Sequence, residues 1–184
     1  MKLSDLVKDK NVLLVGNSKS LLEKNNAELI DSYEFVIRFN LSIARLHNYN
    51  IGNKCDAWIY AMCRQNVINN TYNSAQIKPR VCVRYGDPYE IGEVNINLDV
   101  KKDDVRKEIG IAQRRTRNHQ LMHPSTGIVT TWYMLNKAKP KSLSLIGFDS
   151  FKNPNFYTNY QNAHLCHNLG AEEAYLKRIS ATIL

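Results

Sequence analysis

Several signatures of common protein classes are missing from this sequence of 184 residues. No run approaches the ~20 consecutive apolar residues that a membrane-spanning helix requires. The N-terminal stretch MKLSDLVKDK has a basic start but neither an apolar centre nor a small-residue cleavage site, so it does not resemble a signal peptide. We therefore expect a protein of the cytoplasm with no membrane span.

Cysteine is scarce and lacks metal-binding spacing. None of the four cysteines forms a C-x-x-C pair, which argues against a zinc site and against a disulfide framework; we expect buried free thiols at Cys55, Cys63, Cys82 and Cys166. His164 and His167 flank Cys166, but no third ligand is adjacent, so no metal is expected there. There is also no G-x-S-x-G nucleophile elbow, so acyl transfer has little support.

The overall composition is that of one soluble domain, residues 1–184, with 43% apolar and 23% charged residues. The formal net charge is +8, and the isoelectric point is about 9.3, which favours an anionic partner. Residues 101–117 carry seven Lys or Arg against three Asp or Glu. This segment is either a solvated helix face or a patch that contacts an acceptor or a phosphate backbone.

Apolar runs and amphipathic segments alternate along the chain. Strands are expected at 11–15, 35–37, 57–60, 80–84 and 143–146, with a short strand or irregular edge within 91–98. Helices are expected at 2–9, from Ser18 through Ile30, at 101–117, from the PSTG turn to before Pro140, and at 171–179. This alternation predicts an α/β fold, with a mostly parallel sheet flanked by helices.

Short polar side chains follow the expected strands. The stretch VLLVGNSKS places Asn17 and Ser18 after the first strand, yet it lacks the second and third glycines of a dinucleotide fingerprint. Asn40 follows the second strand, and Gly147-Phe148-Asp149 follows a late one. Ligands of open α/β sheets bind at the carboxyl ends of the strands. The PSTG turn adds a helix N-terminus, which suits a phosphate or carboxylate.

A histidine precedes the last expected helix, in HNLGAEEAYL. His167 is the side chain type best suited to take a proton near neutral pH. Glu172 lies five residues on, where its carboxylate could cap the turn or orient the imidazole. The alternative is an ordinary helix start with an acidic first turn, which the helix dipole favours.

Together these segments resemble the motifs of the eukaryotic-type sialyltransferase family. VLLVGNSKSLLEKNNAELIDSYEFVIRFN looks like the long sialylmotif, and IGNKCD resembles the segment that follows it. HPSTGIVTTWYMLNKAKPKSLSLIGFDSF looks like the small motif, and HNLGAE matches the very small motif, H-x4-E. The family implies a variant Rossmann-like fold of the GT-A kind and a metal-independent, inverting glycosyltransferase. Its donor is a nucleotide sugar, typically CMP-sialic acid, with no other cofactor; accordingly, the sequence has no Asp-x-Asp pair.

The resemblance also implies roles for residues. His167 would be the general base, supported by Glu172, whereas the donor nucleotide would contact Asn17, Ser18, Asn40, Ser125, Thr126 and Gly127. Further candidates for contacts with a phosphate or the acceptor are Tyr157, Tyr160, His123, Arg114 and Arg115. The family's motif-spanning disulfide has no counterpart, since no cysteine lies within 11–40.

Three functions remain open. The first is a glycosyltransferase that acts on a glycan or lipid-linked acceptor, in a compact bacterial or viral version of the family. The second is a phage-type transferase that adds a sugar to hydroxymethylated pyrimidine in DNA, which the basic 101–117 segment and the isoelectric point favour. The third is a non-catalytic module that binds a nucleotide or nucleic acid.

Overall fold

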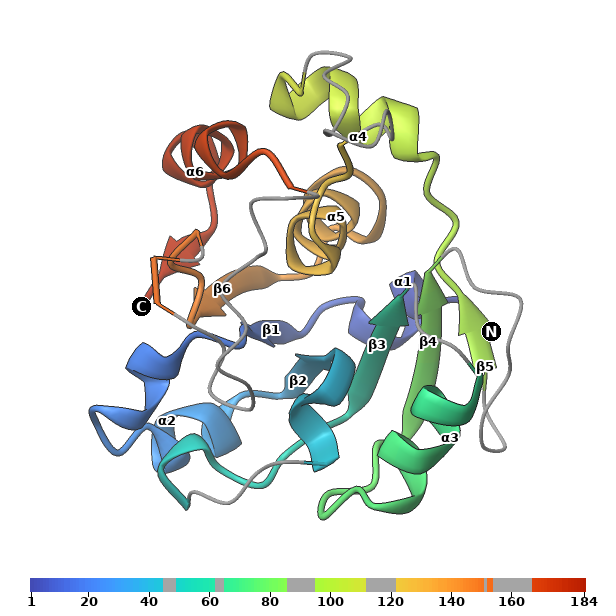
Figure 1. Cartoon of the computed structure of the whole chain (residues 1–184), viewed down its shortest axis with the longest axis vertical. Helices are drawn as coiled ribbons and strands as arrows, with labels where there is room; N and C mark the ends of the chain where they lie inside the picture. The colour runs from blue at the N-terminus through green and yellow to red at the C-terminus, as the bar shows by residue number, and fades with distance from the viewer. Residues whose placement is uncertain (45–48, 62–64, 86–94, 112–121, 151, 154–166) are drawn as a thin grey trace.

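A seven-stranded, all-parallel sheet forms the centre of the molecule (Figure 1). The computed structural model describes residues 1–44, 49–61, 65–85, 95–111, 122–150, 152–153 and 167–184. The strand order is β5-β4-β3-β2-β1-β6-β7. The strands are β1 (Asn11–Val15), β2 (Phe35–Phe39), β3 (Ala57–Ala61), β4 (Val81–Tyr85), β5 (Asn95–Asn97), β6 (Ser142–Ile146) and β7 (Thr182–Ile183). The predicted parallel α/β fold is confirmed.

Helices cover both faces of this sheet (Figure 1). One face carries α1 (Leu3–Val7), α4 (Lys102–Ile109), α5 (Thr126–Tyr133) with its π-helical extension η4 (Met134–Ala138), and α6 (Leu169–Arg178). The other face carries α2 (Ala27–Ser32), α3 (Gln65–Asn73) and the 3-10 turns η1 (Lys19–Leu22), η2 (Asn40–Ala44) and η3 (Tyr49–Ile51). No helix among the described residues is long and apolar enough to span a membrane.

Strand β1 shows why the strand sequences are apolar without interruption. Val12 and Leu14 point into the core under α1, α5 and α6, whereas Leu13 and Val15 point into the core under α2. All four side chains are buried. A parallel strand covered on both faces needs apolar residues at every position, and the alternating pattern of a half-exposed strand is therefore absent.

Two expected helices are shorter than the sequence pattern suggests. The helix expected from Ser18 through Ile30 is divided into η1 and α2, because the Asn26 side chain donates to the Leu21 carbonyl and its backbone N–H donates to the Asn50 carbonyl. The helix expected at 101–117 ends at Ile109, where Gly110 takes a left-handed conformation with φ 72°. Helix α3 and strand β7 were not predicted.

A buried arginine explains much of the long motif. Arg38 in β2 is fully buried, and its guanidinium donates to the carbonyls of Lys54 (2.9 Å), Ile51 (2.6 Å) and Gly52 (3.2 Å). The Asp31 carboxylate accepts from the backbone N–H groups of Asn53 and Lys54, at 2.9 Å and 2.8 Å. These motif residues therefore hold the loop that leads into β3, which is a folding role.

The backbones of the turns after β1 and β6 approach each other closely. The Gly16 N–H donates to the Ile146 carbonyl at 2.7 Å, and a Cβ on Gly16 would lie 2.2 Å from the Gly147 carbonyl oxygen. Only glycine allows this contact. Since the obstacle is backbone, a larger residue must separate the two turns.

We expect Gly16→Ala to lower the free energy of unfolding by about 1–3 kcal/mol, the usual cost of overpacking. Gly170→Ala is the matched control, because Gly170 is an exposed helical residue whose added Cβ would meet only the Asn168 side chain, at 3.9 Å. That change should stabilise the protein by about 0.5–1 kcal/mol. Urea unfolding measures both, and equal midpoints for the two variants would refute the close approach.

Candidate active site

The sheet has a topological switch point beside β1. From β1 the chain proceeds outward through β2 to β5 on one side, and then returns to β6 on the other side of β1. Ligands of such sheets bind at the carboxyl ends of the strands that flank this point. Here those ends are Gly16 after β1 and Gly147 after β6.

The ring of Phe148 joins the predicted long and small motifs at this edge. A Cβ on Gly16 would lie 3.0 Å from the Phe148 ring, and a Cβ on Gly127 in α5 would lie 2.7 Å from it. The ring also makes an edge contact with Phe39 of β2, with 6.1 Å between the ring centroids. The N-terminus of α5 is therefore held against the turns that follow β1 and β6.

The hydroxyl of Ser18 forms hydrogen bonds within the protein. Its Oγ donates to Asp149 Oδ2 at 2.7 Å and accepts from the Ser20 N–H at 3.1 Å. The side chain is buried, and it caps η1. Ser18, expected to contact the donor, thus uses its only proton on a carboxylate from the β6 turn. Asp149 was not among the predicted site residues, although the GFD sequence after the expected strand marked its position.

The two asparagines lie at the ends of β1 and β2. Asn17 is half-buried in the turn after Gly16. Asn40 has a left-handed backbone with φ 49°, its carbonyl accepts from Trp58 Nε1 at 2.6 Å, and its side-chain oxygen accepts from the Ala61 N–H at 3.3 Å. The structure thus places Asn17 beside the switch point, while Asn40 links the ends of β2 and β3.

Glu172 connects the two C-terminal motifs. Its carboxylate accepts from the Ser125 N–H at 2.8 Å and from Ser125 Oγ at 2.7 Å. Ser125 in turn caps α5, with its Oγ accepting from the Ile128 N–H at 3.4 Å. Glu172 is only 2% exposed, and burial raises its pKa, although a charge on His167 and the Ser125 hydrogen bonds act in the opposite direction.

The His167 ring lies beside this carboxylate with a defined proton position. His167 Nδ1 is 2.7 Å from the His123 carbonyl oxygen and 3.9 Å from Glu172 Oε1. A carbonyl only accepts, so Nδ1 carries the hydrogen and the lone pair of the neutral ring is on Nε2. The predicted pair of His167 and Glu172 is thus brought together, with Glu172 on the Nδ1 side.

His123 is in turn held by helix α4. Arg106 Nη2 is 2.7 Å from His123 Nδ1, and Arg106 Nε donates to the Met122 carbonyl at 3.0 Å. Burial lowers the pKa of His123, and the charges of Arg106, Lys102 and His167 lower it further. Arg106 was not predicted, because no local pattern distinguishes it from the other cations of its helix.

Four predicted site residues lie outside the described part of the chain: Tyr157, Tyr160, Arg114 and Arg115. Cys63, His164 and Cys166 lie outside it as well. Cys55 and Cys82 are buried free thiols, as expected. Within the described ranges, no group of three or more His, Cys, Asp or Glu side chains is arranged to hold a metal ion.

Known proteins resemble this chain in one sequence segment and in the fold. Residues 10–83 match the model of glycosyltransferase family 29 (sialyltransferase). The fold matches a crystal structure of a mammalian sialyltransferase, with a TM-score of 0.58 and 17% identity over 98% of this chain and 70% of that chain. It also matches a mammalian sialyltransferase in complex with Gal-beta-1-3GalNAc-ortho-nitrophenol, with a TM-score of 0.59 and 17% identity over 99% and 71% of the two chains. No curated protein sequence matches the chain.

The parallel sheet and its solved counterparts define a Rossmann-like α/β fold of the kind seen in sialyltransferases. The segment match confirms the predicted resemblance to the sialyltransferase family over residues 10–83, and the solved structures share the fold of the chain. The family match ends at residue 83. The PSTG and HNLGAE motifs lie outside this match, so the roles that the resemblance implies for them stay predictions.

Glu172→Gln should change how stability depends on pH. Because burial raises the folded-state pKa of Glu172 above its ordinary value of 4.5, the folded protein binds this proton more tightly than the unfolded chain does. That contribution is complete below pH 4.5 and is lost as the pH rises through the folded-state pKa. As the pH rises over that interval, the unfolding free energy of the Gln variant should therefore increase relative to that of the parent. Urea unfolding from pH 4 to 8 tests this, and a parent that gains on the variant would contradict it.

Proposed function

We propose that the protein transfers a sugar from a CMP-sugar-like donor to an acceptor hydroxyl, with inversion, without a metal and without a further cofactor, and with His167 as general base. The observation that supports this most is the 2.7 Å contact between His167 Nδ1 and the His123 carbonyl. It assigns the basic lone pair to Nε2 of an imidazole that adjoins the N-terminus of α5 through Glu172 and Ser125.

The donor phosphate is proposed to bind at the N-terminus of α5. The first-turn N–H groups of Thr126 and Gly127 have no intrahelical acceptor, because the acceptors would lie before the helix. The helix dipole adds partial positive charge at this end. Asn17 approaches from the β1 turn as a neutral donor. N–H groups fixed in this way can stabilise the charge that develops on a departing phosphate, which is the task a metal performs elsewhere.

The proposed step is a single displacement. His167 Nε2 accepts the proton of the acceptor hydroxyl while that oxygen forms a bond to the anomeric carbon. The bond between the anomeric carbon and the phosphate oxygen breaks, and its electron pair leaves with CMP. The proton remains on His167 as an imidazolium. A charge on His167 lowers the pKa of Glu172, so the imidazolium favours the ionised carboxylate beside it.

A glycan is the preferred acceptor. One structurally similar sialyltransferase is described in complex with Gal-beta-1-3GalNAc-ortho-nitrophenol. The DNA alternative depends on the basic segment 101–117, which carries seven Lys or Arg against three Asp or Glu. Of these cations, Arg114, Arg115 and Arg117 lie outside the described residues.

His167→Ala should reduce transfer to background and leave the Kd for the donor nucleotide within a few fold, since the base acts on the acceptor. His167→Gln is the companion variant, because its amide can still donate to the His123 carbonyl but cannot take a proton. Both should be inactive while Asn136→Ala, a change on the exposed side of η4, stays active. Turnover by either His167 variant would rule out the base assignment.

Asn17→Ala should weaken binding of the donor nucleotide without changing which nucleotide is preferred. Thermal shifts with CMP, UMP, GDP and UDP measure both properties, because ligand that binds only the folded state raises Tm with its affinity. We expect CMP to give the largest shift in the parent and a smaller one in Asn17→Ala. An unchanged CMP shift in the variant would exclude Asn17 from the donor site, and a larger shift with GDP or UDP would refute the donor class.

A further inference from the structure

We propose that Arg106, on α4, is a positioning residue that holds His123 and, through the His123 carbonyl, the ring of His167. This role rests on the proposed function. It means that α4, a helix outside the family-like motifs, holds the proposed base in position. Arg106 would not touch the substrate. Its effect would be to fix one proton on each of two neighbouring imidazoles.

The contacts of the Arg106 guanidinium define the proton position on His123. Arg106 is half-buried, and it contacts two consecutive residues: Nε donates to the Met122 carbonyl at 3.0 Å, and Nη2 lies 2.7 Å from His123 Nδ1. A guanidinium has donors only, so His123 Nδ1 must accept. His123 is therefore neutral, with its hydrogen on Nε2.

The His123 carbonyl connects this contact to His167. The carbonyl of His123 accepts the Nδ1 hydrogen of His167 at 2.7 Å. Arg106 contacts both the Met122 carbonyl and the His123 ring. These two contacts restrict rotation of His123, whose own carbonyl orients His167. Small displacements of a base are costly, because a shift of about 1 Å can lower a rate roughly 100-fold.

The surroundings of His123 agree with a neutral ring. The charged and titratable groups that act on it are Arg106 and Lys102 from α4 and His167 from the segment before α6. Each of these disfavours a second proton, and burial does so as well. Without Arg106, one of these contributions and the Nδ1 donor are both lost.

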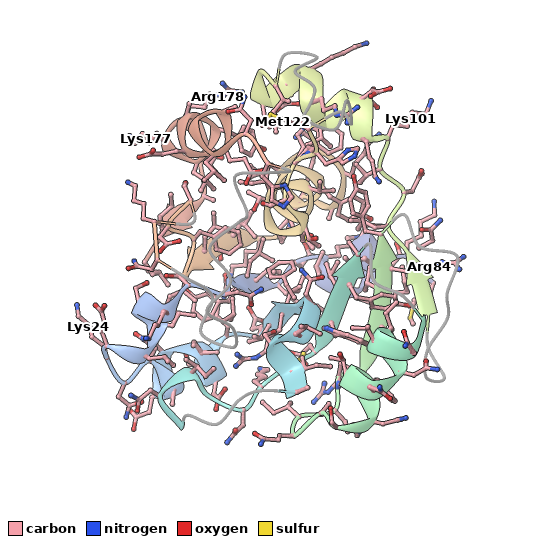
Figure 2. The ribbon with its side chains drawn as sticks, in the orientation of Figure 1. Lys24, Arg84, Lys101, Met122, Lys177 and Arg178 are labelled. Atoms are coloured by element: carbon pink, nitrogen blue, oxygen red, sulfur yellow. The ribbon has the colours of Figure 1, made fainter. Side chains whose placement is uncertain are left out.

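Helix α4 does not depend on Arg106 for its place. Val105 and Ile109 are buried in the core, and Trp132 Nε1 of α5 donates to Glu108 Oε2 at 2.5 Å. Arg178 of α6 donates to the Glu108 carbonyl. Figure 2 shows Arg178 on α6 and Met122 beside α4. The Arg106 bridge to Asp103 is solvent-exposed on the acidic side, with 78% side-chain exposure, and contributes little.

Arg178→Ala is therefore a matched control. Arg178→Ala removes a guanidinium and its hydrogen bond to the Glu108 carbonyl of α4, whereas Arg106→Ala removes a guanidinium and the contacts with Met122 and His123. Arg106→Lys is the conservative variant, because an ammonium keeps the charge but cannot reach two acceptors with the fixed fork of a guanidinium.

The decisive experiment is nitrogen NMR of the protein labelled with ¹⁵N-histidine, with His123 assigned through His123→Gln. In the parent and in Arg178→Ala, His123 should be protonated on Nε2 alone through neutral pH. In Arg106→Ala its pKa should rise, and both tautomers should be populated, with Arg106→Lys in between. An Arg106→Ala spectrum like that of the parent would overturn the proposal. So would equal changes in the Arg106→Ala and Arg178→Ala spectra.

The kinetic counterpart separates positioning from donor binding. Arg106→Ala should lower kcat by roughly tenfold or more, with the KM for the donor within a few fold and with an altered pH profile, whereas Arg178→Ala should match the parent. If the parent transfers no sugar from any donor, the proposed function fails. The NMR result still decides the positioning role, because it requires no turnover.

Discussion

The carboxylate of Glu172 is the contact on which the site depends. It accepts two hydrogen bonds from Ser125 and lies 3.9 Å from His167 Nδ1. One buried side chain thus fixes the start of α5, where a phosphate is proposed to bind, relative to the imidazole that is proposed to take a proton. A buried carboxylate is costly unless it is hydrogen-bonded. This one has two donors within 2.8 Å, which offset part of the cost of its burial at the position where the two motifs meet.

A second serine and carboxylate pair repeats the arrangement at the other side of the switch point. Ser18 Oγ donates to Asp149 Oδ2, which joins the turn after β1 to the turn after β6. In both pairs a helix-capping serine uses its single hydroxyl proton on a carboxylate from a distant segment. The motif serines thereby fix the shape of the site. The backbone N–H groups of the α5 turn are then the fixed donors that are proposed to bind the phosphate.

The strand sequences and the strand-end residues were sufficient to predict the fold class and the edge of the sheet that carries the site. β1 is apolar at four consecutive positions because both faces are covered, and Asn17, Asn40 and Gly147 follow strands that end at one edge. What could not be predicted was the use of each side chain. Ser18 and Asp149 are 131 residues apart, and Ser125 and Glu172 are 47 apart, so only the folded chain shows that these pairs exist. Arg106 illustrates the same limit, because its contact with His123 depends on the packing of α4 against α5 and α6.

We propose that one sheet edge holds the donor phosphate at the start of α5 and the base beside it. A crystal structure of the protein with bound CMP is the most direct test. We expect a phosphate bonded to the N–H groups of Thr126 and Gly127, within reach of Asn17, with His167 Nε2 turned toward the space where the sugar would lie. A nucleotide bound away from the β1 and β6 turns, or a phosphate bound by α4 instead of α5, would contradict it.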